Sequence, residues 1–280
     1  MSIYLAQKID GEIISADSRQ VYKGLDIGTG KVTKKEMAGI PHHLLDVASS
    51  KHIYSASDFD AAAKKAISKI VTNKKTPVIV GGTGFYVDTL LGRMIFPDVP
   101  PNEKLREQLE KKSVEELFAM LTKKDPQRAA NIEKSNKRRL VRALEIAAAL
   151  GRSPEGGPAL TGKGAYDVLW LGINVPEAKL QKNIHTRLLS RIKDGIVEEA
   201  QKLHRQRLSY ARMEQLGLEY RYLSQLLQNK ISKEEFVEQL ERAINQYAKR
   251  QMRWFKRNKD IHWVKNKSEA LKLAQAFLTP

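Results

Sequence analysis

The sequence predicts an α/β fold, a parallel β-sheet interrupted by a helical insertion, and three observations carry this prediction. Short apolar segments alternate with amphipathic segments over the first hundred residues, which is typical of βαβ units and a parallel sheet. A group of prolines then precedes a long, charged helical stretch, and a further apolar segment follows that stretch. The chain has 280 residues and is 41% hydrophobic, which suffices for a packed core in one large domain or two unequal ones.

The chain begins inside a helical pattern. Ile3, Ala6 and Ile9 have the spacing of one apolar helix face, and Gly11 fits the residue just past a helix end. No capping residue precedes this helix, and no strand leads into it. We therefore expect that a first strand and loop are missing from the chain. The alternative is a short N-terminal helix that frays.

Two strands and one helix are predicted between residues 12 and 80. Residues 12–16 and 77–80 are short apolar runs that read as buried strands. Because ligands of a parallel sheet bind at the C-terminal ends of its strands, the residues after these two runs are candidates for a functional site. A helix is expected over residues 57–71, and its apolar face consists of Phe59, Ala63, Ile67 and Ile70.

A helical insertion is predicted at residues 102–165, within an α/β core made of residues 1–101 and 166–280. The pattern from 102 to 150 is strongly helical and charged. Glycines and prolines in residues 151–164 suit a flexible return to the core.

The part of the chain after the insertion is predicted to rejoin the core. Residues 168–175 form an apolar run that predicts a strand resuming the sheet. After Pro176 the pattern reads as helical throughout.

Positive charge is concentrated in the second part of the chain. The formal net charge is +17. Residues 1–100 hold 13 Lys and Arg against 10 Asp and Glu, so +14 of the total falls in residues 101–280. Such a balance favours a polyanionic partner, because each cation docked on a phosphate releases a counterion. The alternative is that the charge serves solubility alone.

Composition excludes several classes of protein. The absence of cysteine excludes a disulfide scaffold, thiolate zinc sites and cysteine nucleophiles. No apolar run approaches the roughly 18 to 20 residues of a membrane helix, and the N-terminus lacks the basic and apolar regions of a signal peptide. We therefore expect a cytoplasmic protein with no membrane partner. His42 and His43 with Asp46 do not have the spacing of metal ligands, so a loop or packing role is favoured there.

A polar segment, Asp17-Ser18-Arg19-Gln20, follows the first predicted strand. A carboxylate in that place can act as a general base or a metal ligand, and the arginine and glutamine beside it can bind phosphate or the edge of a base. The alternative is that Asp17 only caps the turn that follows it.

A glycine-rich segment, Gly81-Gly82-Thr83-Gly84, follows the second predicted strand. Its backbone N–H groups and its hydroxyl suit a phosphate or a closely approaching nucleotide. A purely structural tight turn is the competing interpretation. The segment is not a Walker A loop, because G-x-x-x-x-G-K-[ST] does not occur in this chain.

Two predicted helices are rich in cations. Arg139 and Arg142 are three residues apart and therefore share one helix face. In residues 246–257, cations that include Lys249 and Arg250 alternate with aromatic residues, a mixture that can bind phosphate and stack on bases. The alternative for each helix is a solvated basic face over a core stripe. In the second helix that stripe would consist of Tyr247, Met252 and Phe255.

Six segments form an ordered pattern that covers nearly the whole chain. They are GEIISADSRQVYKGLDIGTGK from Gly11, PHHLLD from Pro41, YSASDF from Tyr54, PVIVGGTGFYVDTLL from Pro77, RRLVRALE from Arg138 and QYAKRQMRWFKR from Gln246. Together they resemble the tRNA dimethylallyltransferases, also called tRNA isopentenyltransferases, although no single segment is specific. The resemblance implies a P-loop-NTPase-like core with an insertion that helps to bind tRNA. It also implies transfer of a dimethylallyl group from its diphosphate to N6 of the adenine immediately 3′ of the anticodon.

The resemblance implies roles for individual residues. Asp17 matches the carboxylate that orients the amine and takes its proton, which a poor nucleophile needs. Thr83, Arg187 and Arg212 are expected beside it in catalysis, the arginines as cations for the departing diphosphate together with Mg²⁺. The target base has to leave its stack to reach the site. Contact with the anticodon stem-loop of tRNA is expected from Asp17, Ser18, Arg19, Gln20, Thr83, Arg106, Arg138, Arg139, Leu140, Val141, Arg142, Lys249 and Arg250.

The chain also departs from the family pattern. The family's P-loop, with its lysine and hydroxyl, should lie just upstream of Met1 and is absent from the sequence. Asn183 stands where an arginine is usual, and extra residues stand around Gly217. We therefore expect the chain as it stands to bind tRNA, to lack its main diphosphate and Mg²⁺ site, and to be a monomer.

Two other functions remain open. A nucleotide kinase-like phosphotransferase would share the fold but would not need the charge of +14 in residues 101–280. A truncated, non-catalytic remnant would keep the tRNA-binding surface and lose the chemistry.

Overall fold

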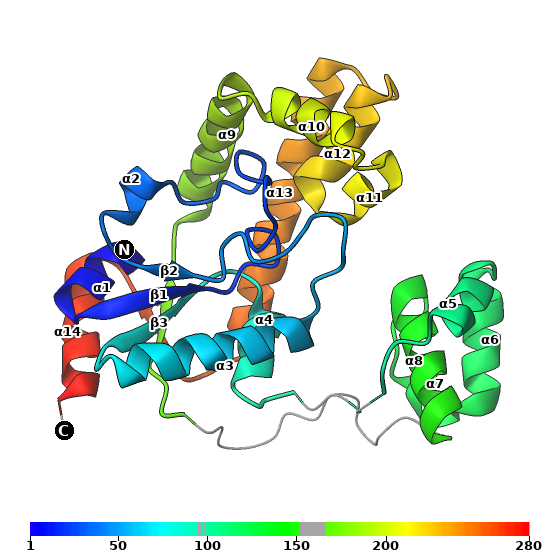
Figure 1. Cartoon of the computed structure of the whole chain (residues 1–280), viewed down its shortest axis with the longest axis horizontal. Coiled ribbons are helices and arrows are strands. Elements are labelled where there is room, and N and C mark those ends of the chain that lie inside the picture. The colour runs from blue at the N-terminus through cyan, green and yellow to red at the C-terminus, as the bar shows by residue number, and fades with distance from the viewer. Residues whose placement is uncertain (95–96, 98, 152–165, 280) are drawn as a thin grey trace. The chain divides into compact units, whose positions relative to one another are not determined.

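The computed structural model describes residues 1–94, 97, 99–151 and 166–279 (Figure 1). The chain divides into two compact units, Met1–Leu90 with Asp167–Pro280, and Leu91–Tyr166. The second unit begins before the prolines at which we expected the insertion to start. The flexible return predicted at 151–164 lies, after its first residue, outside the described residues.

The first unit contains a three-stranded parallel sheet with β1 (Gly11–Ser15) in its centre. β2 (His42–His43) pairs with one side of β1 and β3 (Thr76–Val80) with the other. Every residue of β1 is buried, including the polar Glu12 and Ser15, as expected for a central parallel strand that is covered on both faces. β1 and β3 run in register from their first residues to their last, so both strands end at the same edge of the sheet.

The helix predicted next to this sheet is confirmed as α3 (Ala56–Thr72). It begins at a capping box, in which the Ser55 hydroxyl accepts from the Asp58 N–H and the Asp58 carboxylate accepts from the Ser55 N–H. α4 (Gly84–Leu90) follows β3 and packs against α3. The predicted apolar face is buried in the core of this unit, namely Phe59, Ala63, Ile67 and Ile70.

The N-terminal helix is confirmed as α1 (Ser2–Lys8), and no side chain caps its first turn. The placement of Gly11 just past the helix end was wrong. The residue with the left-handed conformation is Asp10, with φ 47°, and Gly11 already belongs to β1. Gly11 is tightly enclosed for another reason, because a Cβ there would lie 3.0 Å from the carbonyl oxygen of Thr76 and from Cγ2 of Val78.

The third predicted strand exists as β4 (Trp170–Ile173), but it does not resume the first sheet. In the described part of the chain it pairs in parallel with β5 (Ile261–Val264), and the two strands form a sheet of their own. The prediction that everything after Pro176 is helical was therefore wrong at β5. A strand of four residues between long helices is too short for its period to be recognised.

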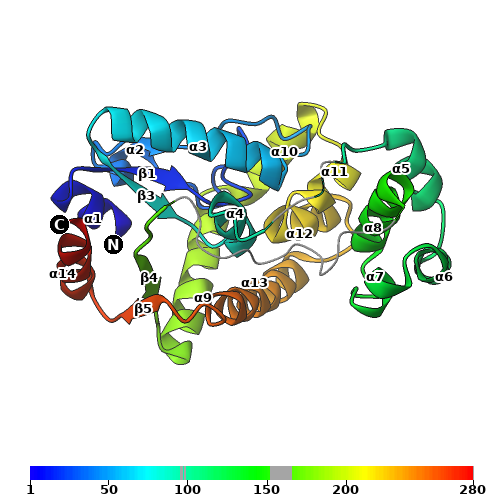
Figure 2. The same ribbon diagram turned by 90° about the horizontal axis from the view of Figure 1, so that it is seen from below.

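The last part of the chain is otherwise mostly helical. α13 packs against both α9 and α12, and α14 packs against α1 (Figure 2). Several of these helices share a hydrophobic core with Val21, Tyr22 and Leu25 from the segment after β1. Their bounds are α9 (Glu177–Lys193), α10 (Ile196–Arg205), α11 (Tyr210–Gln215), α12 (Leu218–Leu227), α13 (Lys233–Phe255) and α14 (Lys267–Leu278), and the short α2 (Lys34–Met37) lies between β1 and β2.

The second unit is a small helical domain with its own hydrophobic core. Leu117, Leu121 and Leu140 are fully buried in that core. The four helices described in this unit begin at side-chain caps from Asn102, Ser113, Asp125 and Asn136. Its helices are α5 (Glu103–Glu110), α6 (Val114–Lys124), α7 (Pro126–Ala130) and α8 (Lys137–Leu150).

Among the described residues, none of the helices combines the length and the apolar character that crossing a membrane requires.

Candidate active site

Asp17 and Thr83 are brought together at the C-terminal edge of the three-stranded sheet. The chain leaves β1 and β3 side by side, with a 2.7 Å hydrogen bond from the Ala16 N–H to the Val80 carbonyl. Two residues further on, the Ser18 N–H donates to the Thr83 hydroxyl oxygen at 3.1 Å. The two polar segments predicted after these strands therefore meet, as expected for adjacent parallel strands.

The Asp17 carboxylate is held by the turn that follows it. Its Oδ1 accepts hydrogen bonds from the backbone N–H groups of Arg19, at 2.8 Å, and Gln20, at 3.3 Å. Asp17 is thus a turn-capping residue, the alternative that the sequence left open. Capping and catalysis are compatible here, because both bonds end on the same oxygen and fix the direction of the other, Oδ2.

The glycines of the segment after β3 are required by close neighbours within the protein. A Cβ on Gly81 would lie 2.2 Å from the carbonyl oxygen of Ala16. A Cβ on Gly82 would lie 2.0 Å from Nε2 of Gln251, a side chain of α13 that donates to the Gly82 carbonyl at 2.9 Å. A Cβ on Gly84 would lie 2.2 Å from the ring of Trp254. These contacts favour the structural turn over a phosphate cradle.

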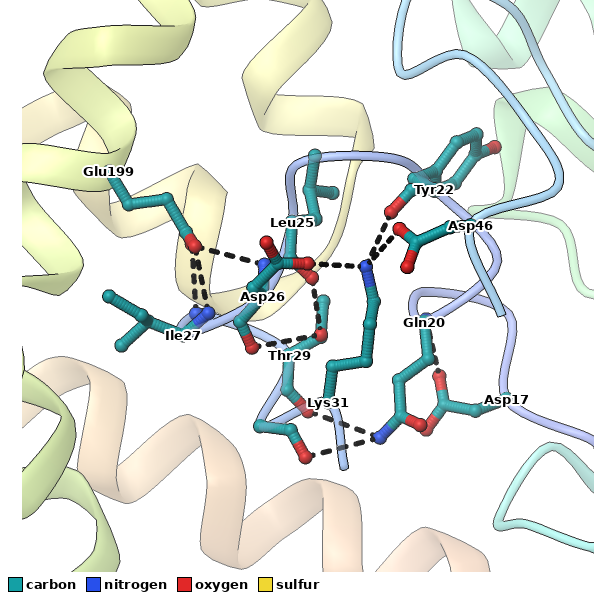
Figure 3. A network of polar contacts seen from close by, with 12 residues as sticks. Asp17, Gln20, Tyr22, Leu25, Asp26, Ile27, Thr29, Lys31, Asp46 and Glu199 are labelled. Atoms are coloured by element: carbon teal, nitrogen blue, oxygen red, sulfur yellow. Dashed lines mark hydrogen bonds and ion pairs between the residues drawn. The ribbon is translucent and has the colours of Figure 1, made fainter. Parts of the chain in front are cut away.

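Gln20 connects Asp17 to a loop that follows it in sequence (Figure 3). The side-chain amide nitrogen of Gln20 faces the carbonyl oxygens of Thr29 and Gly30 at 3.5 and 3.4 Å. In Figure 3 its amide oxygen lies on the side of Asp17. The backbone N–H of Gln20 donates to Oδ1 of Asp17 at 3.3 Å, so the glutamine amide and the carboxylate belong to one turn.

A buried lysine fixes the same loop from within. The side chain of Lys31 is 6% exposed, and its ammonium group lies 2.6 Å from Oδ1 of Asp26 and 2.6 Å from Oδ1 of Asp46 (Figure 3). It also donates to the Tyr22 carbonyl at 2.9 Å. A lysine that is almost fully buried needs such partners, so Lys31 is an anchor of the loop.

Three residues whose link to Asp17 the sequence did not reveal interact electrostatically with its charge. Burial lowers the pKa of the Arg191 guanidinium and raises the pKa of the Glu219 carboxyl, and the two groups form an ion pair at 3.5 Å. Burial also raises the pKa of the Tyr247 hydroxyl, with a further contribution from the charge of Asp17. These residues come from α9, α12 and α13, and helical periodicity does not reveal that three distant helices converge on one carboxylate.

The two arginines expected beside the diphosphate have different surroundings. Arg187 is exposed on α9, one turn before Arg191. Arg212, on α11, is occupied by its own protein: Nε donates to the Ser50 carbonyl at 2.8 Å and Nη2 to the His52 carbonyl at 2.5 Å. These hydrogen bonds give Arg212 a role in holding this loop, and its contact with diphosphate stays a prediction.

Arg19 turns away from the sheet edge. Its Nη1 donates to the carbonyl of Gln215 at 3.3 Å, at the end of α11. Gly217 allows this approach, since a Cβ there would lie 3.1 Å from Nε of Arg19. Arg19 thereby connects the segment after β1 to the junction of α11 and α12.

Two of the insertion's predicted tRNA contacts are structural. Glu145 is buried, and its carboxylate accepts from Nε of Arg106 at 2.9 Å and from Nη1 of Arg142 at 2.5 Å. Burial alone would raise the pKa of Glu145, but the hydrogen bonds from Arg106, the Asn102 N–H and Arg142 hold it below its ordinary value. Arg106 and Arg142 are thus clamps on a buried carboxylate.

The remaining residues of the basic segment on α8 divide between core and surface. Leu140 and Val141 are 0% and 6% exposed. The expectation that their side chains contact tRNA is corrected, because they pack inside the helical unit. Arg138 and Arg139 are exposed, and Arg139 forms a surface ion pair with Glu133 at 3.0 Å.

Along α13 and just beyond it, cations lie at the surface next to aromatic residues, of which Tyr247 is exposed and Trp254 and Phe255 are half-buried. Lys249 is exposed and pairs with Glu177 at 3.0 Å. Arg250 lies 5.7 Å from the centre of the Tyr247 ring, and Arg257 lies 4.1 Å from that of Trp254. Tyr247 is 39% exposed, so the proposed core stripe was wrong at this position.

The described residues alone do not supply a full set of ligands for a magnesium ion. No group of three or more His, Cys, Asp or Glu side chains lies close enough to hold a metal in that part of the chain. Mg²⁺ commonly keeps several waters and binds through one or two carboxylates plus the phosphates of a substrate. An ion bound near Asp17 would therefore arrive with a diphosphate rather than occupy a cage of side chains.

The fold and the site define a class of protein. The parallel sheet with polar residues at its C-terminal edge is a P-loop-NTPase fold, shared with the full-length tRNA isopentenylpyrophosphate transferase from Bacillus halodurans. That structure has a TM-score of 0.71 at 32% identity and covers 99% of this chain and 89% of its own. The structure of a eukaryotic dimethylallyltransferase acting on tRNA has a TM-score of 0.77 at 28% identity, over 91% of this chain and 65% of its own.

The family follows from the sequence comparison. The chain belongs to the IPP transferase family, whose model matches residues 20–258. It is 43% identical to tRNA dimethylallyltransferase 2 of Treponema denticola, over 94% of this chain and 90% of that protein. It is 38% identical to tRNA dimethylallyltransferase 2 of Citrifermentans bemidjiense, over 99% of this chain and 90% of the relative. The resemblance noted from six segments is confirmed.

Proposed function

We propose that this protein transfers a dimethylallyl group from dimethylallyl diphosphate to N6 of the adenine immediately 3′ of the anticodon in tRNA. Membership of the IPP transferase family supports this function. The observation that carries it in the structure is Asp17, held by its own turn at the end of a central buried strand, beside Thr83 and Gln20.

The chemistry explains why a carboxylate stands there. The exocyclic amine of adenine is a poor nucleophile, and its attack forms a C–N bond as the C–O bond to diphosphate breaks. Asp17 accepts the proton that the amine loses, as a general base does. The amide oxygen of Gln20 accepts from the other N–H of the same amine. Both require that the adenine is turned out of its stack.

Cations and Mg²⁺ stabilise the departing diphosphate in this proposal. Arg187, which is exposed on α9, and Arg212 are the candidates in this chain. Mg²⁺, when bound, supplies positive charge to the diphosphate oxygens.

The tRNA surface in this proposal consists of accessible groups only. Ser18 and Thr83 lie at the sheet edge near the target base, with Asp17 and Gln20. Arg19 belongs to the same segment, although its guanidinium group bonds to Gln215. The phosphates of the anticodon stem-loop are contacted by exposed cations, where each contact adds counterion release. These cations are Arg138 and Arg139 on α8 and Lys249 and Arg250 on α13.

The test measures dimethylallyl incorporation into tRNA transcripts, under single-turnover conditions, for wild type and Asp17→Asn. The substitution should lower the rate by about 10²-fold or more, the scale of a general base, with little change in tRNA affinity. Asp10→Asn, which changes an exposed carboxylate at the other end of β1, is the matched control. An undiminished rate in Asp17→Asn would remove Asp17 from the mechanism.

Donor binding is tested separately. Arg187→Ala is compared with wild type over a range of dimethylallyl diphosphate concentrations, with Lys182→Ala, an exposed cation on the same helix, as the control. Arg187→Ala should raise the KM for the donor, because one cation for the diphosphate is lost. An unchanged KM would remove Arg187 from the donor site.

The competing functions have distinct outcomes. Phosphorylation of a nucleotide by the purified protein would support a kinase, and tRNA binding without transfer in any of these chains would support a non-catalytic remnant. We also propose a cytoplasmic monomer that needs no second copy to complete the site. Light scattering of the protein bound to tRNA tests the stoichiometry.

A further inference from the structure

A single carboxylate from a distant helix holds the loop Leu25–Lys31. Oε2 of Glu199, on α10, accepts from the backbone N–H groups of Asp26, at 2.9 Å, and Ile27, at 2.8 Å. Oε1 accepts from the Gly28 N–H at 3.0 Å and from the hydroxyl of Tyr220 at 2.6 Å. Figure 3 shows the carboxylate facing these successive N–H groups. Charge-assisted bonds of this kind are the strong ones.

The held loop presents its carbonyl groups to two side chains of the active site. Gln20 faces the carbonyl oxygens of Thr29 and Gly30. Nη1 of Arg191 donates to the Gly28 carbonyl at 3.3 Å. Gly30 has no side chain because Arg191 passes close to it, with 2.0 Å between Nη2 and the place of a Cβ. The loop therefore stands between Glu199 and the residues around Asp17.

From this arrangement we infer that Glu199 is a positioning residue for transfer, which acts by holding the loop so that the Gln20 amide oxygen stays beside Asp17. The inference rests on the proposed function, in which that oxygen accepts from the target adenine. Glu199 is suited to the task because one anion satisfies three consecutive backbone donors, which a neutral side chain cannot do.

A merely structural role would give a different result, and the difference can be measured. If Glu199 only stabilises the fold, the effect of its replacement adds to that of replacing any site residue, as independent effects do. If it acts through Gln20, replacing both residues should have the same effect as replacing one.

The experiment uses an anticodon stem-loop RNA with 2-aminopurine immediately 3′ of the target adenine. Turning the adenine out unstacks its neighbour and raises the fluorescence of the 2-aminopurine, so the wild-type protein should give a rise on binding. RNA affinity and a thermal melt are measured beside it. The variants are Glu199→Gln, Gln20→Ala and the two combined, with Glu198→Gln, an exposed neighbour on α10, as the control.

Glu199→Gln should reduce the population of turned-out adenine about tenfold, the scale expected when a charge-assisted hydrogen bond is removed. Affinity for the RNA should be retained, Gln20→Ala should give the same reduction, and the double variant should give no further reduction. Glu198→Gln should behave as wild type. Tyr220→Phe removes one hydrogen bond to Glu199 and leaves the packing intact, so it should give a smaller reduction in the fluorescence rise. If Glu199→Gln does not fold, the Tyr220→Phe result tests the inference in its place.

Two results would overturn the inference alone: an unchanged fluorescence rise in Glu199→Gln, or reductions from Glu199→Gln and Gln20→Ala that add. A wild-type protein that neither binds the RNA nor raises its fluorescence would instead overturn the proposed function, and this inference with it.

Discussion

At Gly81 a side chain would meet backbone, whereas at Gly82 it would meet the movable end of a side chain. The nearest atoms to a Cβ on Gly81 are the carbonyl oxygen and carbon of Ala16, at 2.2 and 2.4 Å. On Gly82 the nearest atom is Nε2 of Gln251 at 2.0 Å. Backbone next to the central strand cannot move without disturbing Asp17, but the Gln251 amide can swing away. Gly81 therefore protects the backbone next to Asp17, whereas Gly82 only leaves room for the side chain of Gln251.

We expect Gly81→Ala to destabilise the protein by about 1 to 3 kcal/mol, the usual cost of overpacking. Gly82→Ala should cost less, and little at all in a Gln251→Ala background, where the close atom is absent. Urea unfolding of these variants beside wild type measures this. Equal stability of Gly81→Ala and wild type would mean that the contact with Ala16 relaxes freely.

Glu12 gives the sheet a dependence on pH at the end opposite the site. Its carboxylate lies in β1, 2.7 Å from Nε2 of His43 on β2, and 3.6 Å from the ammonium group of Lys75. The hydrogen bond with His43 lowers the pKa of Glu12 below its ordinary value of 4.5, and this outweighs the opposing effect of burial. A carboxyl whose pKa is lower in the folded state stabilises the protein above its unfolded pKa and loses that contribution as pH falls through the folded value.

The wild-type melting temperature should therefore fall more steeply below pH 4.5 than that of Glu12→Gln. Near neutral pH the variant should be the less stable of the two. Glu238→Gln, an exposed position on α13, serves as the control and should keep the wild-type profile. Parallel profiles for wild type and Glu12→Gln would contradict the assignment.

At the scale of elements, the local sequence pattern predicts where a helix lies but not which residues pack against its side chains. The spacing of Arg139 and Arg142 correctly places cations on α8, yet one is exposed and the other clamps Glu145. A buried carboxylate three residues after Arg142 looks in sequence like any other charge of a solvated face. The same limit hid Glu199 and Arg191, whose contacts with the loop Leu25–Lys31 join residues more than 150 positions apart.

The Glu145 clamp gives a prediction for the helical unit. Arg142→Ala leaves the buried carboxylate with Arg106 and the Asn102 N–H, and should destabilise the unit Leu91–Tyr166 by about 1 to 3 kcal/mol, the cost of losing one hydrogen bond to a buried charged group. Arg139→Ala, which removes an exposed pair with Glu133, should cost less than about 1 kcal/mol. Hydrogen exchange of the backbone amides of α5 and α8 measures both. Equal protection in the two variants would mean that solvent replaces the clamp.

At the scale of the whole molecule, the sequence predicted the fold class from alternating patterns, but it did not predict how the strands divide. β1 and β3 followed from apolar runs, whereas β4 and β5 form a sheet of their own, because strand partners depend on the path of the whole chain. Asp17 and Thr83 could be predicted as site residues because each directly follows its strand in the sequence. The groups around them could not, because they come from helices in the last part of the chain.

Charge is the property of the whole chain that bears most directly on its partner. A net charge of +17, with +14 in residues 101–280, implies tRNA binding that weakens steeply with salt, with log K falling by about 0.7 to 0.9 per phosphate contact. Arg138 and Arg139 are exposed on α8, so their double replacement by alanine should weaken binding and flatten the slope by about one such unit for each phosphate that is no longer bound. The control is Lys65→Ala with Lys69→Ala on α3, which removes the same charge from exposed positions. Because a general attraction depends on net charge and a phosphate contact on position, equal slopes for the two double variants would exclude direct contact by the α8 arginines.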